Sequence, residues 1–207
     1  MWHVLEPFYV YSILGLSKKK MVYPEVIHGM FVDLRSITLD DAEFSYNIRA
    51  DKRNRDTVGQ LAASLEAQKD FIRWQMQEPN DYYFVVLNKK GERIGLYGVY
   101  DIHDGMAEVG REVNVGEPTE IMEVGLLVAD FCRDVLKLNR TCFVVYENNV
   151  HHLSDVKKNS TFVRKVVRSG HNAFYFEDDL NEGSTSSRKI RQMLEKLYKK
   201  SLTLTKG

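Results

Sequence analysis

The chain has 207 residues, of which 43% are hydrophobic and 28% charged, so it suffices for one globular domain with a substantial core. Lys plus Arg equals Asp plus Glu at 29 each, and this balance argues against a nucleic-acid partner, which usually requires a basic excess. Cys132 and Cys142 lie in apolar segments and are interpreted as buried thiols of a cytoplasmic protein. Without CxxC or HExxH spacings, and with His151 and His152 adjacent, no metal site is expected.

The beginning of the chain predicts neither a membrane anchor nor a secretory signal. Its apolar stretch at 8–16 is about half as long as a membrane-spanning helix. Positive charges at 18–20 follow this stretch, whereas a secretory signal has them in front. We therefore expect a cytoplasmic location without a membrane partner. Residues 1–29 are predicted as an extension, and the part before Met21 is either an additional element or sequence upstream of the natural start.

Hydrophobic periodicity and turn residues predict an α/β (α+β) domain at 30–180, with a loop and a C-terminal helix at 181–207 packed on or beside it. Thr38 and the acidic residues after it favour a helix start. Asp104-Gly105 favours a hairpin within an antiparallel meander. The predicted elements are, in chain order, strand 31–37, helices 39–50 and 62–77, strands 82–87, 93–102 and 107–115, helix 119–138, strand 141–146, helix 151–158, strands within 162–176 and helix 188–200.

The element order and three local patterns resemble the GNAT superfamily of N-acetyltransferases over roughly 30–176. Residues 34–42 are similar to the family's opening Leu-Arg followed by Asp-Ala. Ala-Glu-Val-Gly-Arg at 107–111 resembles a fourth-strand pattern of bacterial members that acylate amines on sugars and protein ends. Residues 136–149 resemble the family's fifth strand and its coenzyme-contacting Asn.

This resemblance implies a mixed, mostly antiparallel central sheet flanked by helices, in which strands 107–115 and 141–146 splay apart. It also implies acetyl-CoA as cosubstrate and a small-molecule amine as acceptor, and it leaves a homodimer open. Three family features are missing, the first being the usual Gly-Phe after the last short helix, where Asn159-Ser160-Thr161-Phe162 stands. Residues 116–121 lack the later glycines of the family's pyrophosphate loop, and the position of the family's catalytic Tyr falls near Val156, which cannot donate a proton. The general acid is therefore unassigned.

The start of the long helix is the predicted site of the coenzyme pyrophosphate, because a helix N-terminus offers free N–H groups and a partial positive charge. A well-capped core helix is the alternative. By resemblance, the preceding strand pairs with the pantetheine arm, and an asparagine after the fifth strand either binds that arm or only forms a turn and helix cap. The predicted cofactor-binding residues are Val113, Asn114, Val115, Gly116, Thr119, Glu120, Ile121, Asn148 and Asn149.

The third strand of the meander provides the candidate general base. Strict alternation puts Glu108, Gly110, Glu112 and Asn114 on one face and Val109, Arg111, Val113 and Val115 on the other. Glu112, nearer the splay, is the first candidate and Glu108 the second, unless this face is simply solvated. Tyr97 and Tyr100 are predicted to line the acceptor pocket or to pack in the core. Arg111 is predicted to bind an anionic substrate or to form a salt bridge.

These predictions favour an acetyl-CoA-dependent N-acetyltransferase that acts on an amino sugar, best a nucleotide-linked one in surface polysaccharide synthesis. One alternative is the acetylation of a protein N-terminus or another small amine. Another is a GNAT-shaped module that binds the coenzyme or a partner without catalysis. A deep polar acceptor pocket would favour the sugar, and an open acidic groove would favour a peptide.

Overall fold

The computed structural model describes residues 22–52, 54, 61–180, 185–199 and 205–206. Predictions for 1–21, and for the loop at 181–184, lie outside these residues. The elements, in chain order, are β1 (Ile27–His28), β2 (Val32–Ser36), the 3₁₀ turn η1 (Leu39–Asp41), α2 (Ala42–Ala50), α3 (Leu65–Gln75), β3 (Tyr82–Asn88), β4 (Arg93–His103), β5 (Met106–Asn114), α4 (Pro118–Asp130), the π-helical segment η2 (Phe131–Val135), β6 (Arg140–Tyr146), α5 (Val150–Asn159), β7 (Thr161–Arg168), β8 (His171–Asp179), α6 (Thr185–Tyr198) and β9 (Thr205–Lys206).

Nine strands of the described chain form one sheet in the order β7-β8-β6-β5-β4-β3-β2-β1-β9. The strand pairs are antiparallel except β5 with β6, which run parallel. The predicted mixed, mostly antiparallel sheet is therefore confirmed. The short outer strands β1 and β9 were not predicted, because two residues carry no recognisable alternation.

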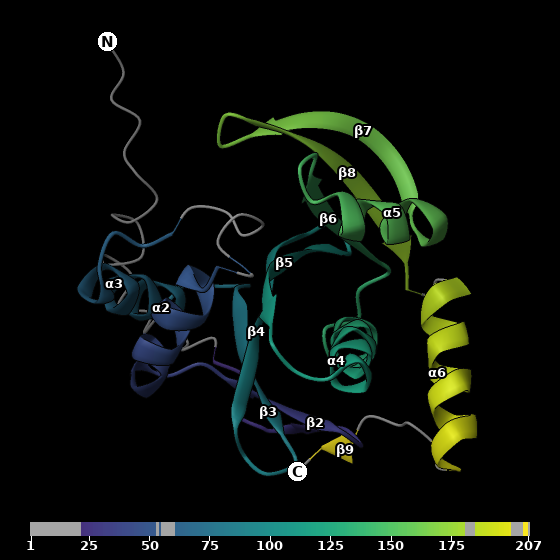
Figure 1. The fold of residues 1–207 in the computed structure, drawn as a ribbon, viewed down its shortest axis with the longest axis horizontal. Coiled ribbons are helices and arrows are strands. Elements are labelled where there is room, and N and C mark those ends of the chain that lie inside the picture. The colour runs from purple at the N-terminus through teal and green to yellow at the C-terminus, as the bar shows by residue number, and fades with distance from the viewer. Residues whose placement is uncertain (1–21, 53, 55–60, 181–184, 200–204, 207) are drawn as a thin grey trace.

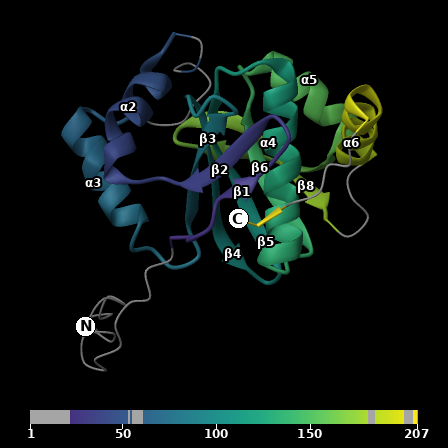
Figure 2. The same ribbon diagram turned by 90° about the horizontal axis from the view of Figure 1, so that it is seen from below.

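Helices cover both faces of this sheet (Figures 1 and 2). Helices α2 and α3 cover one face, over a buried cluster that contains Ile37, Ile72 and Leu96. Helix α4 covers the opposite face, over a larger cluster that contains Leu34 and Val124. We call these the α2/α3 face and the α4 face.

The long helix predicted at 119–138 is α-helical only as far as Asp130. The next turn is π-helical, and its Leu136 N–H donates to the Phe131 carbonyl at 3.1 Å. Three rings pack edge-on against Phe131, which is fully buried: Tyr23, Tyr82 and Phe84. The wider turn thus lies where an aromatic side chain fills the space between α4 and the sheet.

A buried carboxylate fixes the start of the sheet to α4. Glu123 is 1% exposed, and its oxygens accept the backbone N–H groups of Met30, Phe31 and Val32 at 2.7, 2.6 and 2.9 Å. Two of these donors lie in the turn between β1 and β2 and the third is Val32, the first residue of β2, so the carboxylate provides acceptors for backbone N–H groups where strand pairing begins. Helix α4 is thereby held against β2.

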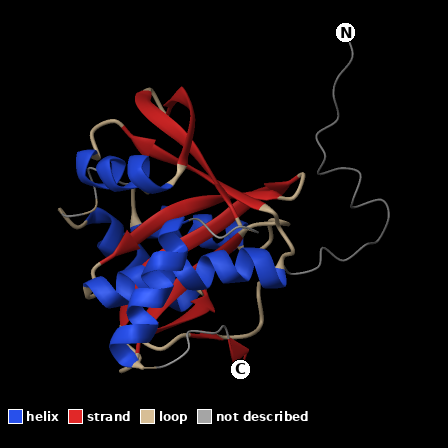
Figure 3. Cartoon of the chain, turned by 90° about the vertical axis from the view of Figure 1, so that its right-hand side faces the viewer, coloured by secondary structure: helices blue, strands red, loops and turns tan. Residues whose placement is uncertain are grey.

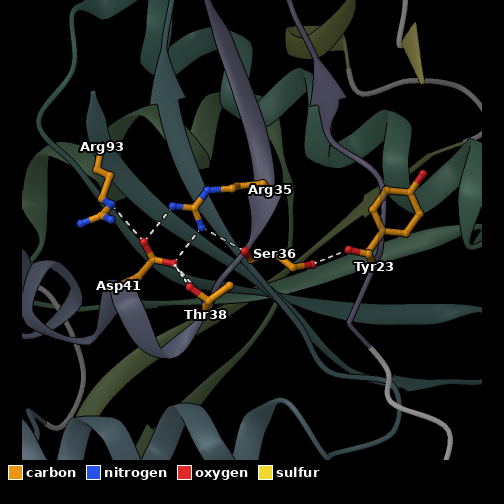
Figure 4. Close-up of polar contacts among 6 residues, drawn as sticks. All are labelled: Tyr23, Arg35, Ser36, Thr38, Asp41 and Arg93. Carbon is orange, nitrogen blue, oxygen red and sulfur yellow. Dashed lines mark hydrogen bonds and ion pairs between the residues drawn. The ribbon is translucent and has the colours of Figure 1, made fainter. Parts of the chain in front are cut away.

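A second buried carboxylate joins β2, α2 and β4. Asp41 is fully buried and accepts two hydrogen bonds from the Arg35 guanidinium, at 2.7 and 2.8 Å. Arg93 lies 3.0 Å from the same carboxylate, and Thr38 donates to it from its backbone and its hydroxyl. Figure 4 shows this cluster beside Ser36, whose hydroxyl donates to the Tyr23 carbonyl. The predicted cap at Thr38 is thus part of a wider ionic network.

Helix α6 packs on the outer side of α4 (Figures 1 and 3). Leu194 is fully buried against Leu126, with Ile190 beside them. Arg191 donates to Asp130 of α4 at 2.7 Å. The C-terminal helix therefore adds a second layer of helix over the α4 face.

The central pair of strands separates partway along its length. Strands β5 and β6 are paired only from Met106 with Arg140 to Glu108 with Cys142. Beyond this point β6 stays paired with β8 as far as Tyr146, and β5 stays paired with β4 as far as Asn114. The splay predicted between the strands at 107–115 and 141–146 is therefore confirmed.

Candidate active site

A cavity of about 1510 Å³ occupies the splay and extends to both faces of the sheet. Phe71 and Arg49 line it from the side of α2 and α3, and Met122 and Ala129 line it from α4. Because β5 and β6 have no hydrogen bonds to each other beyond Glu108 and Cys142, the two sides of the sheet communicate there. A ligand that enters from the α4 face can thus reach a second ligand on the α2/α3 face.

A bulge in β5 decides which side chains reach each face. Leu96 pairs with Val113 and Gly98 with Gly110, so β5 has one more residue than β4 between these pairs. As a result, Val109 packs in the cluster on the α4 face, whereas Val113 packs in the cluster on the α2/α3 face. The strict alternation predicted for 108–115 was therefore wrong. Glu108 and Glu112 lie on opposite faces, because each points away from its neighbouring valine.

Glu112 lies on the α4 side of the splay, close to Tyr97 of β4. Glu112 is exposed and lines the cavity, yet the cavity walls surround its carboxyl and this burial raises the pKa to about 7. Burial raises the pKa of the Tyr97 phenol as well, and the nearby Glu112 carboxyl adds to this effect. Within the described part of the chain, neither side chain forms a hydrogen bond or ion pair. Both groups are thus available to a ligand.

Glu108, in contrast, already has two donors. The Tyr100 hydroxyl donates to Glu108 at 2.7 Å, and Arg168 at the end of β7 pairs with the same oxygen. Burial and the Glu108 carboxylate both raise the pKa of Tyr100. The Glu108 carboxylate is therefore already hydrogen-bonded and ion-paired on the α2/α3 face, whereas the Glu112 carboxyl has no such partner within the described residues.

Arg111 forms an ion pair with Asp81, with 2.7 Å between the guanidinium and the carboxylate. Its guanidinium also lies over the Tyr100 ring, 4.0 Å from the centroid. The side chain is 20% exposed and lines the cavity. Of the two roles predicted for Arg111, the salt bridge is present in the structure.

The start of α4 carries acidic side chains where the pyrophosphate was predicted. Glu120 accepts the backbone N–H of Glu117 at 2.7 Å, in a capping box. A Cβ added to Gly116 would lie only 2.7 Å from the same Glu120 oxygen. An anion at this helix start would therefore have to displace the Glu120 carboxylate or bind beside it.

Asn114 lies at the end of β5, just before α4. Its Oδ1 accepts the N–H of Gly116 at 2.9 Å, while its Nδ2 is buried without a hydrogen-bond partner among the described residues. Buried amide donors are nearly always paired in folded proteins, so this group suits a carbonyl acceptor from a ligand. Among the predicted cofactor-binding residues, Asn114 therefore has a buried N–H donor that a ligand could satisfy.

The cavity brings many of the predicted residues together but not all of them. It is lined by these predicted residues: Glu108, Glu112, Val113, Asn114, Ile121, Asn149, Tyr97, Tyr100 and Arg111. The predicted residues outside its lining are Val115, Gly116, Thr119, Glu120 and Asn148. Asn149 occupies the N-cap position of α5, and its N–H donates to the Tyr146 carbonyl at 3.0 Å.

Several lining residues were not predicted from the sequence. Arg168 reaches Glu108 from 60 positions away along the chain, and Tyr146 and Asp178 also border the cavity. Burial raises the pKa of the Asp178 carboxyl. The turn at Ser169-Gly170 was recognised, but nothing in the sequence indicated that the hairpin it closes extends over β5.

The chain resembles known proteins in sequence pattern and in fold. An acetyltransferase (GNAT) domain family matches residues 32–154. The chain belongs to the GNAT acetyltransferase family. A search of curated proteins found none that matches.

Solved structures of GNAT proteins share this fold at low sequence identity. A GCN5-related N-acetyltransferase from Brucella melitensis is 13% identical with a TM-score of 0.69, covering 86% of this chain and 89% of that one. A chimera of the spermidine N-acetyltransferase SpeG from Vibrio cholerae and hSSAT is 15% identical with a TM-score of 0.64, covering 73% and 96%. Apo FdhC, a nucleotide-linked sugar GNAT, is 17% identical with a TM-score of 0.60, covering 86% and 98%.

Two further properties concern the described residues only. None of the helices there has the length and apolar character needed to cross a bilayer. No group of three or more His, Cys, Asp or Glu side chains there is arranged to hold a metal ion.

Proposed function

We propose that this GNAT protein transfers an acetyl group from acetyl-CoA to a primary amine within the splay between β5 and β6. The observation that carries the proposal is the loss of pairing beyond Glu108 and Cys142. From there, the edge of β5 that faces β6 has no strand partner, and its backbone groups can pair with the amides of a pantetheine arm. The unpaired Nδ2 of Asn114 lies at the end of the same strand.

Glu112 and Tyr97 are the proposed proton-transfer residues. The acceptor amine attacks the thioester carbonyl, and its proton passes to Glu112 directly or through a water molecule. As the carbon–sulfur bond breaks, the Tyr97 hydroxyl donates a proton to the leaving thiolate. The raised pKa of Tyr97 keeps this phenol protonated, whereas Tyr100 already donates to Glu108.

The acceptor we propose is an amino sugar, best one linked to a nucleotide and used in surface polysaccharide synthesis. Three arginines line the α2/α3 side of the cavity: Arg49, Arg111 and Arg168. Glu108 contributes a carboxylate on the same side. Arg111 pairs with Asp81 and Arg168 with Glu108, so three arginines face two carboxylates on this side. This small positive excess suits an acceptor that carries phosphate groups better than a polyamine. The lining also combines charged side chains with aromatic ones such as Tyr97, Tyr100 and Phe71, a mixture that suits a sugar ring with polar substituents.

A non-catalytic module that only resembles the enzymes is the second candidate. The observation that favours it is Glu120, which occupies the start of α4 and opposes a pyrophosphate there. Acetylation of a protein N-terminus or another small amine is the remaining enzymatic alternative.

A binding measurement followed by a rate measurement tests the proposal. Acetyl-CoA should raise the thermal unfolding temperature, and the shift should keep growing with the logarithm of its concentration above Kd, because it binds the native state. Thiol release should then be measured with nucleotide-linked amino sugars, free amino sugars, spermidine and short peptides as acceptors. No thermal shift at millimolar acetyl-CoA would favour the non-catalytic module, and a preference for peptides would replace the sugar as the acceptor.

A further inference from the structure

The bulge in β5 contains an unusual residue at its critical position. Arg111 has φ of +51°, in the left-handed region, at the first residue of the bulge. Glycine normally occupies this position because a Cβ crowds the backbone carbonyl there. Something in the structure must therefore stabilise arginine in this conformation.

The Arg111 guanidinium is held by an ion pair and by stacking on aromatic rings. Asp81, which is 6% exposed, pairs with it at 2.7 Å. Asp81 is itself held by Gln75, whose amide donates to the Asp81 carbonyl at 2.8 Å. The rings of Tyr100 and Phe71 lie 4.0 and 5.4 Å from the guanidinium carbon. A planar cation that is paired and stacked in this way loses little further entropy on being held.

Two opposed glycines provide the room for this arrangement. Gly98 and Gly110 are paired across β4 and β5. A Cβ on Gly98 would lie 3.2 Å from Cδ of Arg111, and a Cβ on Gly110 would lie 2.7 Å from the Tyr100 hydroxyl. The anchored position of Arg111 therefore depends on the local absence of side chains on both strands.

We propose that Arg111, held by Asp81, is a positioning residue that keeps β5 bulged and thereby turns the Glu112 carboxyl into the cavity beside Tyr97. Without the extra residue, Glu112 would have the parity of Glu108 and would lie on the α2/α3 face. In this role Arg111 acts through the backbone of β5, separately from any contribution of its charge to acceptor binding. Its role in catalysis rests on the function proposed above, whereas its effect on Glu112 does not.

The pKa of the Glu112 carboxyl is the quantity to measure, because it depends on which face of the sheet the carboxyl occupies. Tyr97 of β4 lies near it, and Cys132 of η2 and Asp178 of β8 act on the same phenol. The carboxyl titration can be followed by NMR on protein labelled with ¹³C-glutamate, with the signal assigned from Glu112→Gln. The measurement needs neither coenzyme nor acceptor, so it remains decisive if the protein proves to be no transferase.

Two double variants separate positioning from substrate binding. Asp81→Asn is combined with Arg111→Ala or with Arg111→Gly, so that neither protein buries an unpaired Asp81 carboxylate. Glycine adopts a positive φ freely and alanine does not. We expect the alanine variant to lower the pKa of Glu112 by at least about one unit, towards about 4.3 for a free glutamate, and the glycine variant to keep most of the wild-type value.

Activity provides the second readout. The alanine variant should lose kcat at least about tenfold with little change in the KM for acetyl-CoA, and the glycine variant should recover most of that loss. If the two variants had the same Glu112 pKa, or the same kcat, the proposal would be overturned. An equal rise in the KM of the acceptor would show instead that Arg111 binds the substrate.

Discussion

Glu112 and Tyr97 lie near each other where β4 and β5 lose their register, and burial raises the pKa of the phenol with a further contribution from the Glu112 carboxyl. Both groups lie in the cavity, and within the described chain neither has a hydrogen-bond partner. An acid with a pKa of about 7 is well matched to accept a proton at neutral pH.

Glu112→Gln should therefore lower kcat by about 10²- to 10⁴-fold, the usual contribution of a general base. In the wild type, kcat should rise with pH through about 7, because the base form of Glu112 appears there. The measurement is thiol release from acetyl-CoA between pH 5 and 9. Glu43→Gln, an exposed glutamate at the start of α2, is the matched control and should keep the wild-type rate. A fully active Glu112→Gln protein would exclude this residue as the base.

The same pKa has a consequence for stability. Burial raises the pKa of Glu112 in the folded protein, so the unfolded chain releases this proton first as the pH rises above about 4.3. Charging Glu112 thus costs stability between that pH and about 7, and the cost persists above 7. Glu112→Gln should raise the unfolding temperature at pH 8 relative to wild type and change it little at pH 4. A gain that is equal at both pH values would contradict the raised pKa.

The Glu120 carboxylate should weaken coenzyme binding at the start of α4. Glu120→Gln retains a side chain that can accept the Glu117 N–H, but it removes the negative charge. Charges near a helix terminus contribute about 0.3–1 kcal/mol, so the Kd for coenzyme A should fall about two- to fivefold. Pantetheine, which lacks the diphosphate, should bind both proteins equally in calorimetry. An equal gain for pantetheine and coenzyme A would show that the diphosphate lies elsewhere.

Asp41 should be among the most sensitive positions for stability. Asp41→Asn leaves Arg35 and Arg93 without their carboxylate, and breaking a buried ion pair costs about 3–5 kcal/mol in the free energy of unfolding. Burial alone would raise the pKa of Asp41, but hydrogen bonds from Arg35 and Thr38 outweigh it and lower the pKa. The wild type should therefore lose this stabilisation only as the pH falls below the ordinary range of a carboxyl group. Urea unfolding at pH 7 and pH 3 measures both effects, and a cost that is the same at pH 3 would contradict the lowered pKa.

More of the sheet than of the site could be predicted from the sequence. The meander, the helix from Pro118 and the strand at 140–146 were recognisable from periodicity and turn residues. The orientation of Glu112 was not, because alternation assumes an unbroken strand and the bulge at Arg111 reverses it. Arg111 also concealed the bulge, since glycine is the residue that usually indicates one.

The amino-acid sequence by itself determined the order of the longer helices and strands and the presence of two carboxylates on β5, because these depend on local periodicity and residue type. Only the tertiary structure decided which carboxylate is paired and which is open to the cavity. Arg168 meets Glu108, and Asp81 meets Arg111, through contacts between segments far apart in the chain. Such contacts follow from the packing of the whole sheet, and no local pattern encodes them.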